Sequence, residues 1–186
     1  AHEQIVFLAD LINDLSTLSR AERNNLDIIV ETINVHQLVI DIANNHKPQA
    51  DAKNLNLNTE LTPNLELLNT SKLYLYEVLQ NFVTNAIKYT QTGSVTIGAK
   101  PNPKGIEFYI RDTGIGISRN DQAKIFDRFF RSEDFRTRET NGTGLGLYVT
   151  LKIAKFLHAE INVQSELNKG SLFTIVVPNL NIGQNA

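Results

Sequence analysis

The stretch of sequence that decides the fold is residues 79–90, LQNFVTNAIKYT. Its apolar side chains recur at spacings of three and four residues, which predicts an amphipathic helix over roughly 71–90. Asn81 and Asn85 lie in the middle of this helix, although asparagine competes for backbone hydrogen bonds and is a poor residue for a helix interior. Two such costly residues, four positions apart, need an explanation.

The polar face of the predicted helix groups side chains of an unusual kind. Asn81 and Asn85 share it with Glu77 one turn earlier and with Lys88 and Tyr89 one turn later. The face therefore carries amides, an ammonium group and a phenol in place of simple charge. An ordinary solvated helix face hardly explains this set.

Length and composition limit the class of protein. The 186 residues, 41% of them hydrophobic, suit one compact domain with a substantial core. Eighteen basic and twenty acidic residues give a formal net charge of -2, so no global field attracts nucleic acid or anionic lipid, and any affinity for phosphate must be local. The absence of cysteine excludes disulfides, thiolate metal sites and a cysteine nucleophile.

The N-terminal region predicts a helix with a partner. Apolar residues form a stripe along residues 4–20, which is typical of a helix that packs on another helix. The sequence has neither a signal peptide nor an apolar run long enough to span a bilayer. It starts at Ala1, without methionine, inside this helical pattern, so we expect it to be a fragment of a longer protein.

The remaining segments predict an alternation of helices and strands. Helices are expected over 36–50, 119–130 and 145–158, and strands over 26–35, 54–61, 93–100, 105–112, 160–166 and 171–178, the last four as two hairpins. The segment 131–144 has almost no periodic apolar content and is expected to be a mobile loop. This order predicts a two-layer α/β sandwich with a mixed, mostly antiparallel sheet covered by helices on one face and preceded by a long helix.

A first glycine-rich segment, RDTGIGIS, follows the strand that ends at Asp112. Gly114 and Gly116 allow positive φ angles and let the backbone approach a ligand closely. The Asp112 carboxylate can accept a hydrogen bond from an exocyclic amine such as that of adenine. Taken alone, a plain Asp-Thr-Gly turn explains the segment better.

A second glycine-rich segment, NGTGLGL, opens a predicted helix at residues 141–147. Free N–H groups and the positive end of the helix dipole make such a start suitable for a polyphosphate. It is not a Walker loop, because no Gly-Lys-Ser/Thr follows, and it is not a Rossmann fingerprint, because a loop precedes it. A glycine-rich hinge explains this segment equally well when it is considered alone.

The amide-bearing helix gives the two glycine segments a common interpretation. Asn85 offers a neutral oxygen ligand, which suits a Mg²⁺ ion that keeps most of its waters and bridges phosphates. Lys88 supplies a point charge for phosphate, and Tyr89 supplies a flat or hydrogen-bonding group near a base. In this order, the three segments together indicate a nucleotide site.

Four segments in this order resemble the sequence boxes of a known family. NFVTNAIKYT, DTGIGIS, IFDRFFR and GTGLGL closely resemble the N box, first glycine box, F box and second glycine box of sensor histidine kinases, whose Bergerat-type ATP-binding fold is shared with gyrase and MutL. LINDLSTLSRAE resembles the end of the second dimerisation helix of the same kinases.

The resemblance implies ATP and Mg²⁺ as ligands and a role for each matched residue. Asn85 would coordinate Mg²⁺ with Asn81 beside it, Asp112 would bind the adenine amine, and Lys88 and Arg131 would contact phosphate. The remaining residues implied to bind the nucleotide or to anchor the lid over it are Tyr89, Gly114, Gly116, Ile117, Phe126, Phe129, Phe130, Gly142, Thr143, Gly144, Leu145 and Gly146. Residues 132–141 would form the lid itself, ordered with nucleotide.

One family element is missing. Histidine kinases phosphorylate a histidine in an H box of the type Ser/Thr-His-Glu/Asp-Leu-Arg-Thr-Pro-Leu, and no such motif occurs in this sequence. His2 and Glu3 are not followed by Arg-Thr-Pro and lie within residues 1–24, which the resemblance assigns to the second helix. The implied organisation is the second dimerisation helix over 1–24, the catalytic ATP-binding domain over 25–180 and a tail over 181–186.

The implied function is transfer of the γ-phosphate of Mg-ATP to a histidine on a dimerisation domain, and from there to the receiver domain of a response regulator. The full-length protein would be a homodimer anchored in the bacterial plasma membrane, with this domain in the cytoplasm. An ATP hydrolase or conformational switch of the same fold is the main alternative, but gyrase and MutL have a glutamate as general base four residues before the metal asparagine, where this chain has Asn81. A non-catalytic nucleotide-binding module is a further alternative, against which the intact boxes argue.

Overall fold

The computed structural model describes residues 2–23, 26–63, 65, 67–138 and 142–181. The elements are α1 (His2–Glu22), β1 (Glu31–Asn34), α2 (Val35–Ala52), β2 (Asn56–Leu61), β3 (Leu67–Thr70), α3 (Lys72–Tyr89), β4 (Ser94–Asn102), β5 (Gly105–Asp112), α4 (Arg119–Gln122), α5 (Phe135–Arg138), α6 (Gly146–Phe156), β6 (Glu160–Glu166) and β7 (Gly170–Val177). Within these ranges, no helix is both long enough and apolar enough to cross a membrane.

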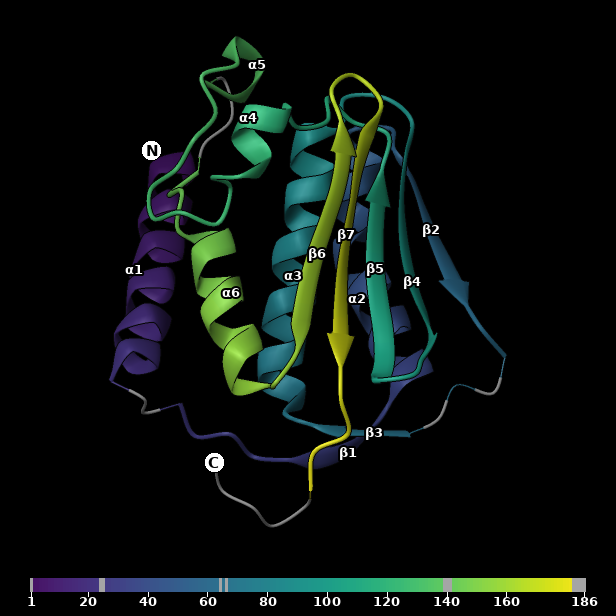
Figure 1. The fold of residues 1–186 in the computed structure, drawn as a ribbon. Coiled ribbons are helices and arrows are strands. Elements are labelled where there is room, and N and C mark those ends of the chain that lie inside the picture. Colours follow the sequence, from purple (N-terminus) through teal and green to yellow (C-terminus); the bar gives the residue numbers. More distant parts are fainter. Residues whose placement is uncertain (1, 24–25, 64, 66, 139–141, 182–186) are drawn as a thin grey trace.

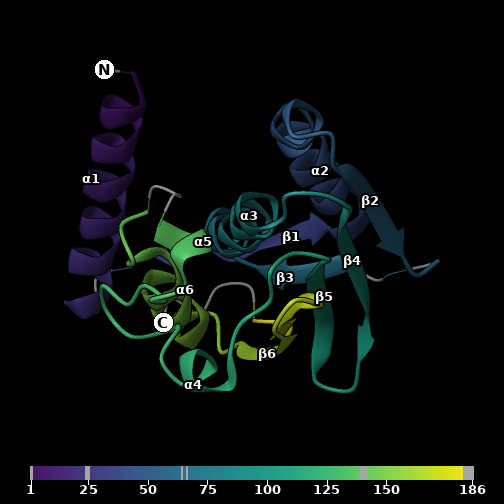
Figure 2. The ribbon, with the colours of Figure 1, turned by 90° about the horizontal axis from the view of Figure 1, so that it is seen from above.

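The main sheet has five strands in the order β2-β4-β5-β7-β6. The pair β2 and β4 is parallel, and the other three pairs are antiparallel. Helices α2, α3 and α6 cover one face of this sheet, as the two perpendicular views show (Figures 1 and 2). The predicted two-layer sandwich, with a mostly antiparallel sheet and a preceding long helix, is therefore confirmed.

Helix α3 fills the centre of the core. Its buried side chains follow the spacing predicted from the sequence, and the ring centroid of Phe82 lies 5.2 Å from that of Phe173 on β7. The fully buried residues of α3 and of the strands that it covers include Leu75, Val78, Leu79, Phe82, Ile87, Ile97, Phe108, Ile110 and Ile175. Burial of each such side chain contributes about 1.5–3 kcal/mol, so this apolar stripe fixes which face of α3 stays polar.

Helix α1 lies beside α6 at one end of the helical layer (Figure 1). Leu18 and Ala21 are buried in this contact, whereas Leu8 and Ile12 are mostly exposed. The apolar stripe predicted for this helix thus has one part that packs within the chain and another that faces solvent.

The strand predicted at 26–35 is shorter in the structure and belongs to a small second sheet. Only Glu31–Asn34 pairs, antiparallel to β3, because β3 itself offers just the four residues Leu67–Thr70. The predicted hairpins are present as β4–β5 and β6–β7. The boundaries of the other predicted elements shift by a few residues.

The helix predicted over 119–130 is wrong beyond its first turn. Ser118 caps α4 by accepting a hydrogen bond from the Asp121 N–H at 3.1 Å, but the helix ends at Gln122 and Phe129 has a φ of 58°. A residue with positive φ cannot continue a right-handed helix. The helical spacing of apolar residues arises because successive turns attach to the core through Ile125, which is buried, and through Phe126 and Phe130, which pack against it.

The segment 131–144 is predicted to be a mobile loop. The structure instead has a short helix, α5, at Phe135–Arg138. Residues 139–141 of the predicted lid lie outside the described residues.

Candidate functional site

A cavity of about 1210 Å³ lies at the C-terminal half of α3. Its walls come from α3, from the end of β5, from the two glycine-rich segments, from the segment 130–137 and from α1. These pieces are far apart in the sequence, and the fold brings them together around one space.

Most of the sequence-predicted site residues line this cavity. They are Asn81, Asn85, Lys88, Tyr89, Asp112, Gly116, Ile117, Phe130, Arg131, Gly142, Thr143, Gly144 and Gly146. Gly114, Phe126, Phe129 and Leu145 are not among the lining residues. Leu145 is fully buried in the core, Phe126 packs against the core and Phe129 is exposed, so their contributions to the site are structural or indirect.

Asp112 stands at the floor of the cavity and is only 7% exposed. Its Oδ1 accepts hydrogen bonds from the backbone N–H groups of Gly114, at 2.8 Å, and of Ser171, at 3.3 Å. Among the described residues, Oδ2 has no hydrogen-bond partner. Burial raises the pKa of Asp112, and the two backbone donors oppose that rise. The second oxygen is thus an acceptor that remains accessible in the cavity, suited to an N–H donor of a ligand.

The amide pair on α3 forms one edge of the cavity. Asn85 Nδ2 donates a hydrogen bond of 3.1 Å to Asn81 Oδ1. A Cβ added at Gly146 would collide with the Asn81 amide, so glycine lets the start of α6 approach this amide closely. The hydrogen bond engages the Asn81 oxygen, while the Asn85 oxygen makes no protein hydrogen bond among the described residues.

Lys88 joins the end of α3 to the second glycine-rich segment. Its Nζ lies 5.1 Å from the centroid of the Tyr89 ring, and a Cβ added at Gly142 would lie 2.6 Å from the same Nζ. An ammonium group, an aromatic ring and the second glycine-rich segment therefore meet at one place. Leu145, the N-cap of α6, makes no side-chain capping bond, so this helix start offers backbone N–H groups to an anion.

The first glycine-rich segment is held in place by β6. The Ile117 N–H donates to Ser165 Oγ at 2.8 Å, and Gln122 Nε2 bridges the carbonyls of Ile117 and Ser165 at 2.8 and 2.9 Å. Gly116 has a φ of 65°, and a side chain there would run into the Glu166 carbonyl. The close approach of this segment to β6 therefore depends on glycine.

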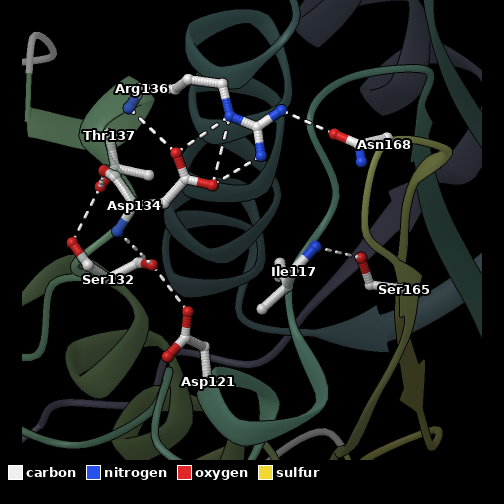
Figure 3. Close-up of polar contacts among 8 residues, drawn as sticks. All are labelled: Ile117, Asp121, Ser132, Asp134, Arg136, Thr137, Ser165 and Asn168. Atoms are coloured by element: carbon white, nitrogen blue, oxygen red, sulfur yellow. Dashed lines mark hydrogen bonds and ion pairs between the residues drawn. The ribbon is translucent and has the colours of Figure 1, made fainter.

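The segment after the F box is tied to two other parts of the fold, as Figure 3 shows. Ser132 Oγ donates to Asp121 Oδ2 of α4 at 2.6 Å. Arg136 forms an ion pair with Asp134, and its Nη1 donates to Asn168 Oδ1 in the β6–β7 turn at 2.7 Å. The pKa of Asp134 is lowered by this bonding to Arg136.

Arg131 belongs to the same segment and lines the cavity. Its Nη2 donates to the Thr137 carbonyl at 3.1 Å, and the Thr137 hydroxyl in turn donates to the carbonyls of Ser132 and Asp134 at 2.9 and 2.7 Å. The segment 131–137 thus holds itself together at one side of the cavity and places a guanidinium group there.

Sequence reasoning missed the contribution of α1. Asn13, Asp14, Ser16, Thr17 and Arg20 line the cavity. Asp14 Oδ2 accepts a hydrogen bond of 2.8 Å from Thr143 Oγ1, the residue between two glycines of the second segment. The polar residues of α1 recur at helical spacing, which is the one signal in the sequence, but their position at the cavity depends on tertiary contact.

Glu77 also lines the cavity, although no role there is predicted for it from the sequence. Burial raises its pKa, a hydrogen bond from Thr17 and the charge of Arg20 lower it, and the charge of Asp14 raises it. Glu77 is therefore a half-buried carboxyl group that faces α1.

Comparisons with known proteins agree with this geometry. The profile of the family described as "Histidine kinase-, DNA gyrase B-, and HSP90-like ATPase" matches residues 70–181. Over 179 residues the chain is 38% identical to the sensor-like histidine kinase SenX3 of Mycobacterium tuberculosis, covering 93% of this chain and 42% of that protein. Over 179 residues it is 31% identical to the aerobic respiration control sensor protein ArcB of Escherichia coli, covering 95% of this chain and 23% of that protein. The chain thus spans less than half the length of these relatives.

Solved structures give the same result. A structure of full-length ShkA in complex with AMPPNP superposes with a TM-score of 0.84 at 25% identity, covering 96% of this chain and 37% of that one. The histidine kinase AdeS of Acinetobacter baumannii superposes with a TM-score of 0.79 at 26% identity, covering 96% of this chain and 82% of that one.

Proposed function

This chain belongs to the family of histidine kinase-, DNA gyrase B- and HSP90-like ATPases, and on that premise we propose that it is the catalytic domain of a sensor histidine kinase. It binds Mg-ATP in the cavity beside α3 and transfers the γ-phosphate to a histidine of a dimerisation domain. The AMPPNP bound by the structural neighbour ShkA supports an adenine nucleotide as ligand.

The observation that carries this proposal is the Asp112 carboxylate. One of its oxygens is held by two backbone N–H groups, and the other is available in a cavity that also contains the amide face of α3 and both glycine-rich segments. We assign Asp112 to the adenine amine and the start of α6, with Gly142, Gly144 and Gly146, to the phosphates.

The donor set of α3 fits a hard divalent cation that keeps most of its waters. Asn85 offers an amide oxygen that makes no protein hydrogen bond among the described residues, and Asn81 holds the Asn85 nitrogen in place. Within the described residues, no three histidine or acidic side chains gather as a candidate metal cluster. A Mg²⁺ ion bound here would neutralise phosphate charge, with Asn85 as its protein ligand.

The chain itself contributes position and charge to the reaction. Lys88 and Arg131 lie on different walls of the cavity, and we assign them to the phosphate that is transferred. Preorganised charges of this kind stabilise a phosphoryl transition state without covalent chemistry. Residues 132–141 would close over the nucleotide and exclude water. The γ-phosphate would then be attacked by an imidazole and not by a water molecule.

Asn81 is the local reason for preferring a kinase over a hydrolase. A carboxamide has no useful basicity, and Asn81 Oδ1 is already engaged by Asn85. An ATP hydrolase remains the second candidate because Glu77, one turn earlier on α3, places a carboxyl group in the same cavity. Replacing Glu77 with glutamine should leave slow phosphate release unchanged in a kinase and should abolish it if Glu77 is the base for water.

The wider organisation follows the family pattern. We assign residues 1–24 to the second helix of a dimerisation hairpin, 25–180 to the catalytic domain and 181–186 to a tail. The phosphoacceptor histidine would belong to a dimerisation domain not contained in this sequence, and a response-regulator receiver domain would accept the phosphoryl group from it. The whole protein would be a homodimer at the plasma membrane with this domain on its cytoplasmic side.

Nucleotide binding tests the first half of the proposal. Isothermal titration with Mg-ATP should give saturable binding, and Asp112→Asn should weaken it about 10- to 100-fold, because a hydrogen bond to a charged group is lost. Asp127→Asn is the matched control, since Asp127 is exposed and lies outside the cavity. No binding by the wild-type chain, or equal affinity of the two variants, would refute the proposed ligand.

Phosphotransfer tests the second half. The chain, γ-labelled ATP and a separately supplied dimerisation domain should give a labelled histidine, and Lys88→Gln should reduce the rate. Absence of transfer alongside a full-length kinase that does label itself would leave the chain as a nucleotide-binding module without kinase activity.

A further inference from the structure

Lys53 lies at the C-cap of α2, and its side chain reaches the end of a different helix. Its Nζ donates hydrogen bonds to the carbonyl oxygens of Ile87 and Lys88, both at 2.9 Å, and of Thr90, at 3.3 Å. These carbonyls belong to the last turn of α3 and to its C-cap. One ammonium group thus uses its three donors on three backbone acceptors of the helix that carries the amide pair.

The end of a helix leaves several carbonyls without an intrahelical partner, and it carries the negative end of the helix dipole. In α3 the other carbonyls of this turn are also occupied. The Ala86 carbonyl accepts from Thr90 Oγ1 at 2.7 Å, and the Tyr89 carbonyl accepts from the Ile115 N–H at 3.2 Å. Each carbonyl from Ala86 to Thr90 therefore has a donor, and Lys53 supplies three of the five.

This turn connects two walls of the cavity. Lys88 and Tyr89 line it, and the Tyr89 carbonyl is bonded to Ile115 in the first glycine-rich segment. A Cβ added at Gly114 would collide with that same carbonyl. The turn is thus held between the Lys53 ammonium group on one side and the first glycine-rich segment on the other.

We propose that Lys53 is a positioning residue for the nucleotide site, because it fixes the last turn of α3 and with it the side chains of Lys88 and Tyr89. Lys53 does not line the cavity itself, so it acts through those two residues. The inference rests on the proposed function in that the ligand is an adenine nucleotide.

The charges around Lys53 are consistent with this role. Partial burial, and then the charge of Lys88, lower the pKa of Lys53. Lys53 therefore holds the last turn of α3 at a place where a second ammonium group, that of Lys88, is near. The carbonyls that Lys53 binds offset the cost of placing two like charges near one another.

The test compares Lys53→Met with a control in the same helix pair. Asn45→Ala removes a hydrogen bond of 2.8 Å from α2 to Tyr76 on α3, and neither residue lines the cavity. Both variants weaken the α2–α3 contact, but only Lys53→Met removes the donors of the last turn. At a temperature where both remain folded by circular dichroism, Lys53→Met should raise the Kd for Mg-ATP about three- to tenfold, and Asn45→Ala should leave it unchanged.

Two further readouts separate positioning from general stability. Lys53→Arg should recover part of the lost affinity, because it restores donors to the same carbonyls. In phosphotransfer to a supplied dimerisation domain, Lys53→Met should raise KM more than it lowers kcat. Equal Kd values for Lys53→Met and wild type, or equal weakening by Asn45→Ala, would overturn the inference.

The link between Lys53 and the last turn of α3 can also be tested without nucleotide. In the nucleotide-free chain, Lys53→Met should shift the backbone amide resonances of Tyr89, Gly114 and Ile115, and Asn45→Ala should not. Unshifted resonances would overturn the role of Lys53 even if the wild type binds ATP. Shifted resonances in a chain that does not bind ATP would instead refute the proposed function and keep the structural link.

Discussion

Asp112 is held in an environment that opposes its own charge. The residue is 7% exposed, and two backbone N–H groups on one oxygen compensate only in part for the lost water. Burial therefore outweighs the hydrogen bonds, and the pKa of the carboxyl group rises. The folded protein therefore bears the free-energy cost of burying the Asp112 carboxylate, which a hydrogen bond from a ligand would reduce.

The pH dependence of stability should reveal this cost. Because the folded pKa of Asp112 is raised, its contribution to stability is fully present below the ordinary aspartate pKa of 3.8 and is lost as pH rises through the folded value. The free energy of unfolding of Asp112→Asn, minus that of wild type, should therefore increase with pH above 3.8 and then level off. Urea unfolding of both proteins from about pH 4 to about pH 8 measures this difference, and a difference that falls with pH would contradict the assignment.

Glycine at 116 is required by backbone geometry, whereas glycine at 142 is not required in this way. Gly116 has a φ of 65° and lies against the Glu166 carbonyl, while a Cβ at Gly142 would meet the flexible end of Lys88. Gly116→Ala should cost about 1–3 kcal/mol in the free energy of unfolding, and Gly142→Ala should cost much less. Urea unfolding checks both variants, and equal losses would show that strain at Gly116 is not the cause.

At the scale of elements, polar contacts tie the segment 131–138 to two neighbouring parts of the fold. Ser132 bonds to α4, and Arg136 bonds to the turn between β6 and β7 (Figure 3). Such contacts are partly exposed and individually weak, unlike the apolar contacts that hold α3. This difference is what a segment needs if it is to open and close at moderate cost.

The contact between Arg136 and Asn168 should govern how often this segment opens. Arg136→Ala should speed amide exchange over 132–138 about two- to fivefold, and Arg119→Ala, at an exposed position on α4, should not. Asn168→Gly should also speed exchange there, because glycine keeps the positive φ of 66° and removes the side-chain acceptor while the Arg136–Asp134 ion pair stays. Hydrogen exchange followed by mass spectrometry measures the exchange rate over 132–138. An unchanged rate in Asn168→Gly would show that the contact between Arg136 and Asn168 does not control the opening of this segment.

At the scale of the whole molecule, α1 completes the cavity from outside the sandwich. Leu18 and Ala21 pack inward, Asp14 bonds to Thr143, and Glu22 pairs with Arg128 after α4. These contacts reach both flanks of the segment that borders the cavity. The position of α1 is therefore coupled to the site, although the core of the domain lies elsewhere.

The two faces of α1 should respond differently to charge. Leu18 is 5% exposed and Leu15 is 44% exposed, so Leu18→Asp should detach α1 and Leu15→Asp should not. Amide exchange over residues 13–22 should accelerate about tenfold or more in Leu18→Asp, because the burial of one leucine is lost. Exchange in β5 and β7 serves as the internal reference, and acceleration there too would indicate global unfolding.

Local pattern predicted much of this fold because local pattern and packing agree in its main elements. The apolar spacing of α3 matches the face that the structure buries, and both predicted hairpins are present as β4–β5 and β6–β7. The prediction failed at 119–130, where residues with helical spacing attach a series of turns to the core and Phe129 adopts a positive φ. Periodicity reports which residues are buried, and there it could not distinguish a helix from an anchored loop.

In the candidate site, too, the sequence predicted some residues correctly as cavity-lining and others not. Residues predicted from the ordered boxes, such as Asn85, Asp112 and Gly144, line the cavity. Gly114 and Leu145 come from the same boxes and do not line it, because Gly114 lies against the Tyr89 carbonyl and Leu145 is buried in the core.

By itself, the sequence determined that α3 has one apolar and one amide-bearing face, and that two glycine-rich segments accompany it. These are local properties, because side-chain spacing and backbone freedom depend on neighbours in the chain. Only the tertiary structure decided that α1 forms a wall of the cavity and that Lys53 reaches the end of α3 from the end of α2. Such contacts join residues more than thirty positions apart, and no local pattern encodes them, since they exist only once the packed core has fixed where each helix ends.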